Sequence, residues 1–124
     1  MTIKVGADPV LFIKDSRTGG VVPIVGLLGG TKEVPMPIKE LGKGFFVQED
    51  NVMAEFNVPA TANYKEFGRN VVQAVNAVRD LVRTKSPFLD IDYAPSRVFM
   101  ADHLKSPQAS MFGCSMEYDG YSAG

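Results

Sequence analysis

Residues 63–83 of this chain, NYKEFGRNVVQAVNAVRDLVR, carry apolar side chains three or four positions apart. That spacing is typical of an amphipathic helix and predicts a single helix over the whole stretch. The apolar stripe expected to face a sheet consists of Tyr64, Phe67, Val71, Val75, Val78 and Val82. Asn63 is the expected N-cap, Glu66 occupies the acidic position of a capping box, and Pro87 marks the end. Such a helix is about 30 Å long, enough to cover one face of a small sheet.

Short strand patterns lie on both sides of this helix. The predicted strands, each a short apolar or alternating run, span 10–14, 21–25, 45–47, 51–58, 88–93 and 96–100. A turn-forming cluster joins the first two into a hairpin. Because proline cannot donate to a ladder, we expect the second strand to lie at an edge or to end at Pro23. Strands grouped before and after one helix indicate an α+β fold, a small curved antiparallel sheet backed by helix 63–83. We expect one domain over 1–124.

The composition is that of an ordinary globular chain with no strong charge bias. Thirteen basic and fourteen acidic residues give a formal net charge of −1, so electrostatics provide no reason to expect nucleic acid as a partner. No run is long and apolar enough to predict a membrane span or a signal peptide. The single cysteine, Cys114, cannot form an internal disulfide. We therefore expect a cytoplasmic protein.

Residues 26–44 are rich in glycine and proline and predict a long irregular loop. A loop of this length in a small domain more often has a function than not. It contains Gly29, Gly30, Thr31 and Lys32, which could offer backbone N–H groups and an ammonium to phosphates. The spacing is not that of a P-loop, and the alternative is an ordinary flexible turn.

Acidic residues gather around the predicted turn before strand 51–58. Glu49 and Asp50 are expected at the turn, and Glu55 is expected on the polar face of the strand, opposite the face of Ala54 and Phe56. Hard cations such as Mg²⁺ bind one or two carboxylates together with phosphate oxygens, so this group suits Mg²⁺–ATP. The alternative is that these side chains only face water. His103 and Cys114 are expected to have no catalytic role.

Four motifs, in this order, resemble the phage-associated COOH–NH₂ ligases, the type 2 amidoligases. The first is Gly6-Ala7-Asp8-Pro9 with Leu11-Phe12, and the second is Gly29-Gly30-Thr31-Lys32-Glu33. The third runs from Val47 to Pro59 through Gln48-Glu49-Asp50-Asn51, and the fourth is Phe112-Gly113-Cys114-Ser115. The family is related in fold to glutamine synthetase and glutamate–cysteine ligase. The resemblance spans this whole chain and about the first half of a typical member.

The resemblance implies an ATP- and Mg²⁺-dependent enzyme that activates a carboxylate as an acyl phosphate and couples it to an amine. By position, it implies that Glu49 or Asp50, together with Glu55, bind Mg²⁺. It also implies that Lys32 and Gln48 contact the nucleotide, with Lys32 on a phosphate or carboxylate group.

Two positions depart from the family pattern. Val10 stands where the family has a glutamate after Asp-Pro, and Met116-Glu117 follow the last motif where the family has proline and aspartate. Glu117 is a candidate to replace that aspartate. Because the second half of the catalytic domain is not part of this sequence, we expect an incomplete or inactive ligase.

The alternative is a non-catalytic phage protein on the same scaffold. Such a protein would bind a host or virion protein, or form a homo-oligomer, because self-association covers apolar surface that an incomplete scaffold exposes. The ligase hypothesis places the chain in the cytoplasm of a phage-infected host cell, and the alternative also allows the virion.

Overall fold

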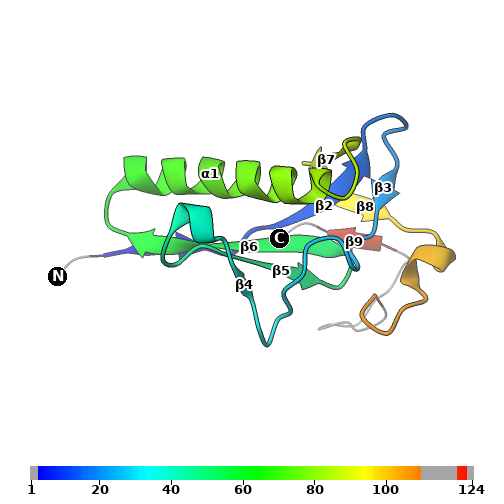
Figure 1. The fold of residues 1–124 in the computed structure, drawn as a ribbon, viewed down its shortest axis with the longest axis horizontal. Helices are drawn as coiled ribbons and strands as arrows, with labels where there is room; N and C mark the ends of the chain where they lie inside the picture. The colour runs from blue at the N-terminus through cyan, green and yellow to red at the C-terminus, as the bar shows by residue number, and fades with distance from the viewer. Residues whose placement is uncertain (1–2, 110–119, 123–124) are drawn as a thin grey trace.

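The structure is a computed structural model that describes residues 3–109 and 120–122. One long helix, α1 (Tyr64–Arg83), lies along one face of an antiparallel sheet, which confirms the α+β class expected from the sequence (Figure 1). The strands are β1 (Val5–Ala7), β2 (Val10–Asp15), β3 (Val21–Val22), β4 (Met36–Pro37), β5 (Phe46–Asp50), β6 (Met53–Thr61), β7 (Leu89–Asp92), β8 (Ser96–Val98) and β9 (Gly120–Ser122). Two short 3-10 helices complete the described part, η1 (Lys39–Leu41) and η2 (Ala101–Leu104).

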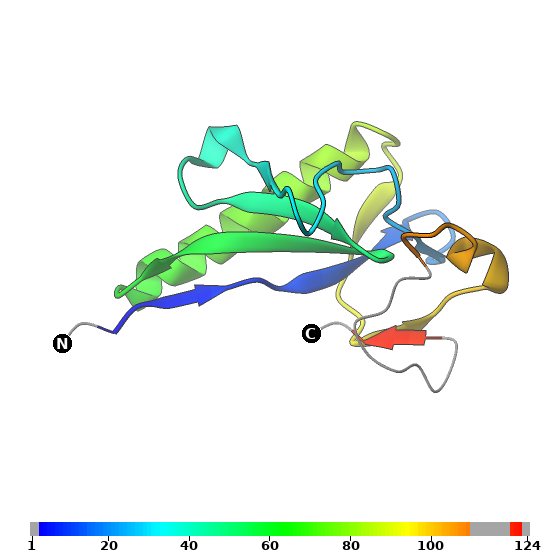
Figure 2. The same cartoon turned by 90° about the horizontal axis from the view of Figure 1, so that it is seen from below.

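The main sheet is built around β6, its longest strand. The sheet has the order β3-β2-β6-β5-β4, with β1 also paired to β6 and β7 also paired to β2. Because β1 and β2 follow each other along the chain and both pair with β6, they form one long twisted run beside it (Figure 2). The register shifts by one residue between Val5 and Ala7, so β6 carries a bulge there. β8 and β9 form a separate antiparallel pair.

The first predicted hairpin is confirmed. Ile13 pairs with Val22 and Lys14 with Val21, so β2 and β3 are antiparallel neighbours. β3 ends directly before Pro23 and is the first strand in the sheet order. The strand therefore ends at Pro23 and lies at an edge of the sheet, as expected, because the proline nitrogen has no hydrogen to continue the ladder.

The helix begins as its sequence predicts, with one correction at the cap. The Asn63 side chain accepts hydrogen bonds from the N–H groups of Lys65 and Glu66, at 2.9 and 3.1 Å. Glu66 does not close a capping box on Asn63, because its carboxylate accepts a hydrogen bond from the Thr61 hydroxyl at 3.1 Å. The same hydroxyl accepts the Asn63 N–H at 3.2 Å, so Thr61 takes the role expected of Glu66.

The face of α1 that meets the sheet is rotated from the predicted stripe. Its buried residues are Asn70, Ala74, Ala77, Val78 and Val82. Tyr64 was expected in the stripe but is 80% exposed, and Val71 and Val75 are only half-buried. Small alanines at the centre of the contact allow the helix backbone to approach the sheet closely, so the larger valines lie at its margins.

Apolar side chains form two clusters, one on each side of the sheet. The larger cluster lies between the sheet and α1 and includes Ile13, Val47, Phe56, Val78 and Ile91. The smaller one consists of Phe12, Val52, Met53, Phe99 and Ala109, and it covers part of the face away from α1. Its Phe12 and Phe99 rings have centroids 6.0 Å apart. The face opposite α1 is therefore partly closed by residues 99–109.

The polar segment before β6 differs from the prediction. Glu49 and Asp50 were expected in a turn, but both belong to β5, and the turn consists of Asn51 and Val52. Asn51 has a positive φ of 55°, a conformation that asparagine tolerates better than most residues. Because neighbouring residues of a strand point to opposite faces, Glu49 and Asp50 cannot act as one group.

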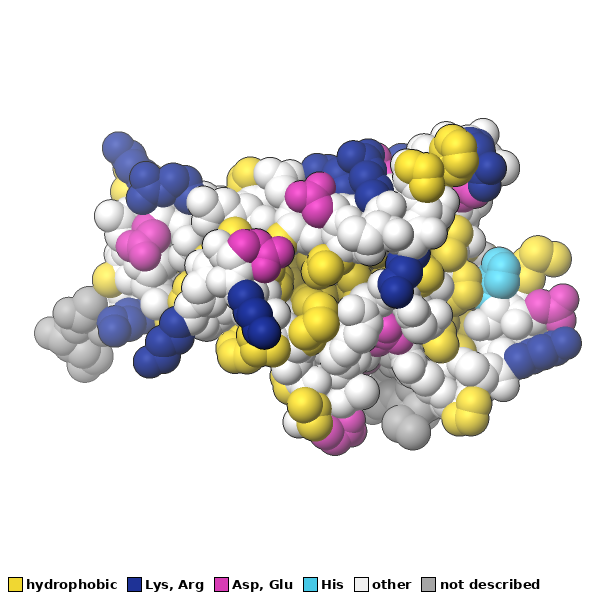
Figure 3. All heavy atoms as spheres, in the orientation of Figure 1, with side chains coloured by type: hydrophobic (Ala, Val, Ile, Leu, Met, Phe, Trp, Pro, Cys, Tyr) yellow, Lys and Arg dark blue, Asp and Glu magenta, His cyan; other side chains and the backbone are white. Residues whose placement is uncertain are grey.

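No helix within residues 3–109 and 120–122 has the length and apolar character needed to cross a membrane. On the face seen in Figure 3, acidic and basic side chains lie among one another with apolar side chains exposed between them.

Candidate functional site

The strand register brings several predicted residues together on the face opposite α1. Gln48 pairs directly with Glu55, and Val10 pairs with Glu55 from the other side. Residues that are directly opposite in an antiparallel pair share a face, so these three side chains form one row across β5, β6 and β2. Asp50 and Asp8 lie on the same face, each two positions from a member of the row. Glu55 is the centre of this group.

The Glu55 carboxyl is buried and held by Gln48. Glu55 is 8% exposed and Gln48 is 6% exposed. The Gln48 Nε2 group donates a hydrogen bond to Glu55 Oε2. The predicted nucleotide contact Gln48 therefore touches the predicted metal ligand Glu55, and it orients the carboxyl.

Burial raises the pKa of Glu55 above its usual value of 4.5. The charges of Asp50 and Asp8 also raise this pKa, whereas the Gln48 hydrogen bond and the charge of Lys32 lower it. Asp8, Asp50 and Lys32 are thus close enough to act on Glu55. A buried carboxyl with two acidic neighbours and one cation is an arrangement in which a bound cation would relieve repulsion.

Glu49 has a different environment from the other predicted ligands. Its carboxylate accepts backbone N–H groups from Gly26 at 2.9 Å, Leu28 at 3.1 Å and Gly29 at 2.9 Å. It also accepts the Gln108 Nε2 group at 3.1 Å. A carboxylate offers about four lone-pair sites, and all of them are used here. Glu49 therefore fixes the loop 26–30 to the sheet, and we leave it out of the proposed ligand set.

The Gly29-Gly30 pair is likewise engaged in the fold. The Gly29 N–H points to Glu49, as described above. Gly30 has a φ of 75°, and a Cβ atom there would approach the Val47 carbonyl oxygen to 2.6 Å. Only glycine fits such a close backbone approach. These two glycines are required by the loop's packing, so Lys32 remains as the candidate ligand-binding residue of this loop.

Lys32 is exposed next to a tight turn of the same loop. The Thr31 N–H donates to the Val34 carbonyl at 3.0 Å, and the Val34 N–H donates to the Thr31 hydroxyl at 3.0 Å. This turn fixes the backbone around Lys32 while its side chain stays in solvent. An ammonium held in this way can meet a phosphate or carboxylate that approaches Glu55.

The described residues contain no group of three His, Cys, Asp or Glu side chains arranged to hold a metal ion. Mg²⁺ does not require such a group, since it is often bound by one or two carboxylates together with phosphate oxygens and waters. Asp50 and Glu55 meet that smaller requirement in chemical type. The fourth family motif, 112–115, and Glu117 lie outside the described residues.

Two contacts near these residues were not predicted from the sequence. Gln108 bridges Glu49 and the Asn51 carbonyl, to which its Nε2 donates at 3.0 Å, and Asn51 Nδ2 donates to the Gln108 carbonyl at 3.2 Å. Asp92, 6% exposed, forms a salt bridge of 2.5 Å with Arg97, which also donates to the Gly19 carbonyl. Gln108 is brought to Glu49 and Asn51 only by the tertiary fold, whereas Asp92 and Arg97 are five positions apart and were not singled out in the sequence.

Comparisons of this chain with protein-family models, with curated proteins and with solved structures found no match.

Proposed function

We propose that this chain carries part of the Mg²⁺–nucleotide site of an ATP-dependent carboxylate–amine ligase. Asp50 and Glu55 would bind the cation, Gln48 would orient Glu55, and Lys32 would contact a phosphate or carboxylate group. The single observation that supports this most is the buried Glu55 carboxyl, placed among two acidic side chains and a lysine on the face opposite α1. Bound ATP would supply the phosphoryl group that activates a carboxylate for attack by an amine, and Mg²⁺ would neutralise the phosphate charge.

The architecture supports the same proposal. A curved antiparallel sheet backed by one helix on one face leaves the other face free of helix α1 (Figures 1 and 2), and residues 99–109 cover only part of it. The resemblance to the amidoligases implies strand carboxylates on such a face. Electrostatic stabilisation of phosphate charge by fixed groups is the main contribution that such a site can make to phosphoryl chemistry.

A second candidate function is a non-catalytic phage protein that binds a host or virion protein or assembles with itself. Val10 favours it, because an apolar side chain stands beside Glu55 at the position where the ligases have a glutamate. Several large apolar side chains also remain exposed on the described surface, among them Ile3, Val34 and Val72.

Nucleotide binding by matched variants separates the two functions. We expect Glu55→Gln and Asp50→Asn to lose Mg²⁺-dependent ATP binding, because each removes one of the two proposed cation ligands. Glu33→Gln changes an exposed carboxylate on the neighbouring loop and should bind as the unchanged chain does. Binding is measured by titration calorimetry, with circular dichroism to show that each variant is folded. Equal binding by all four proteins would refute the metal role of Glu55 and Asp50.

A further inference from the structure

Within residues 3–109 and 120–122, one side of the edge strand β1 has no strand partner. β1 pairs with β6, and among the described residues no strand pairs with its other edge. The Pro9 carbonyl accepts the Phe56 N–H at 3.1 Å. Val5, Ala7 and Pro9 therefore direct their backbone groups toward β6, because alternate residues of a strand face the same neighbour. Lys4, Gly6 and Asp8 therefore direct their N–H and C=O groups outward. Such a row of unpaired groups is a template for another strand.

The edges at β3 and β4 are blocked in ways that this one is not. β4 contains Pro37 and follows Pro35, and β3 has two residues and ends before Pro23. Proline interrupts a ladder at an edge and so protects it from pairing. Pro9 does not protect β1, because its nitrogen faces β6 and not the open side. The free edge from Lys4 to Asp8 is therefore competent to pair.

We propose that two copies of this chain pair through their β1 edges, antiparallel and with the twofold axis at Gly6. In that register Lys4 of one copy lies opposite Asp8 of the other, and the symmetry repeats the pair. Opposite charges in direct cross-strand positions stabilise a sheet, and like charges destabilise it. A register shifted by four residues, centred on Lys4, would place the two lysines opposite each other. The proposed register also forms its ladder bonds with the outward groups of Lys4, Gly6 and Asp8.

Apolar side chains on the helix side of this edge support a second copy as the partner. Ala7 packs against the cluster beneath α1, so Val5 and Ile3, two and four positions earlier, lie on that same side. Val5 is 52% exposed and Ile3 is 77% exposed. A twofold axis perpendicular to the sheet would set these residues of both copies on one side of a continuous sheet. Pairing would then remove them from water.

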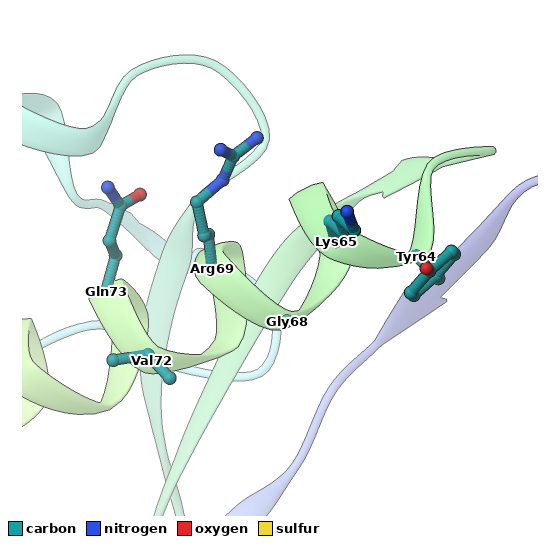
Figure 4. Close-up of a pocket in the computed structure, with 6 residues that line it drawn as sticks. All are labelled: Tyr64, Lys65, Gly68, Arg69, Val72 and Gln73. Atoms are coloured by element: carbon teal, nitrogen blue, oxygen red, sulfur yellow. The ribbon is translucent and has the colours of Figure 1, made fainter.

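The first turns of α1 also expose apolar side chains. Val5 pairs with Thr61, and Tyr64 comes three positions after Thr61 in the chain. Tyr64, Gly68 and Val72 line a shallow groove of about 530 Å³ on the outer side of the helix, together with Lys65, Arg69 and Gln73 (Figure 4). Val72 is 59% exposed. In a paired sheet the two helices would lie on the same face.

Charge reversal tests the register directly. We expect the unchanged chain to have twice the mass of one chain by light scattering coupled to gel filtration. Lys4→Glu alone and Asp8→Lys alone should each weaken the dimer about tenfold or more, because each places like charges opposite each other twice. The double variant Lys4→Glu/Asp8→Lys should restore the dimer. Within one copy these residues are about 13 Å apart along the strand, so only pairing between copies explains a rescue.

Lys39→Glu is the matched control, because it reverses another exposed lysine, on η1. It should leave the dimer intact. Gly6→Pro removes an outward N–H and should give a folded monomer, with folding checked by circular dichroism. A monomer at all concentrations for the unchanged chain, single reversals that remain dimeric, or a folded double variant without rescue would each overturn the proposal. Because none of these readouts involves nucleotide, their failure is distinct from a failure of the proposed ligase function.

Discussion

Val10 and Glu55 lie directly opposite each other on the neighbouring strands β2 and β6. Their side chains share the face away from α1, with Cβ atoms expected about 4.5–5.5 Å apart. Under the proposed ligase function, the position of Val10 would correspond to a glutamate. The strand pairing explains what such a glutamate would do here, since it would place a second carboxylate next to Glu55. Under the proposed ligase function, Glu55 would be one half of a carboxylate pair whose other position is occupied by Val10.

Val10→Glu should therefore strengthen binding of a divalent cation. A carboxylate at this position would join Asp50 and Glu55 as a third oxygen ligand, and we expect affinity for Mn²⁺, as a probe of the Mg²⁺ site, to rise about tenfold. Titration calorimetry measures the change. Val34→Glu, which adds the same charge on an exposed loop position, serves as the control and should bind as the unchanged chain does. Equal affinities of both variants would argue against a cation site at Glu55.

Glu55 should make the fold less stable as pH rises. Burial, followed by the charges of Asp50 and Asp8, raises the pKa of Glu55 in the folded chain. The folded state therefore holds this proton more tightly than the unfolded state does, so stability is fully present below the unfolded pKa of about 4.5 and declines as pH rises through the folded pKa. Glu55→Gln should remove this decline. Urea unfolding at a series of pH values measures it, and parallel curves for the two proteins would contradict the prediction.

Glu49→Gln should lower the free energy of unfolding of the ligand-free chain. The substitution replaces one carboxylate oxygen by an amide NH₂ group, which cannot accept hydrogen bonds from Gly26, Leu28 or Gly29. Loss of charge-assisted bonds to buried donors costs about 1.5–3 kcal/mol. Urea unfolding gives this free energy, and Glu33→Gln on the same loop should change it little. A loss no larger than that of the control would mean that Glu49 does not hold the loop.

The Asp90 carboxylate should stabilise the fold at higher pH and lose this effect at low pH, which is the opposite of the pH dependence expected for Glu55. Burial raises its pKa, but the hydrogen bond from Arg79 at 2.8 Å, the Ile91 N–H and the charges of Arg79 and Arg83 outweigh burial, so the net shift is downward. This contribution is present above the unfolded pKa of about 3.8 and is lost as pH falls through the folded pKa. Asp90→Asn should cost about 1 kcal/mol at neutral pH. A double-mutant cycle with Arg79→Gln measures the pair, and a coupling energy of zero would contradict this account.

The elements with a clear periodicity could be predicted from the sequence. Helix 63–83 appears within one residue of its expected start, and the β2–β3 hairpin ends at Pro23 as expected. The face of the helix was less predictable, because residues on both sides of the apolar stripe satisfy the same spacing. Ala74 and Ala77 lie in the contact between α1 and the sheet, because their small side chains allow the helix to approach the sheet more closely.

The candidate site was only partly predictable. Alternation in 51–58 correctly separated Glu55 from Ala54 and Phe56, but the polar run 48–51 was expected to be a turn. Gln48, Glu49 and Asp50 continue the strand because each pairs with β6, and this pairing sends Glu49 to the side opposite Glu55. The Glu49 carboxylate accepts three backbone N–H groups of loop 26–30, and each of these donors lies more than 19 positions from Glu49 in the sequence. Local patterns carry no information on such contacts.

The most direct test of the proposed nucleotide site is a thermal-shift titration of the unchanged chain with ATP, with and without Mg²⁺. Ligand at ten times its dissociation constant stabilises the fold by about 1.4 kcal/mol, which raises the unfolding midpoint by about 4–8 °C for a domain of this size. Our account predicts such a rise with ATP and Mg²⁺ together, and little or none with either alone. An unchanged midpoint at millimolar ATP and Mg²⁺ would contradict it and favour the non-catalytic function.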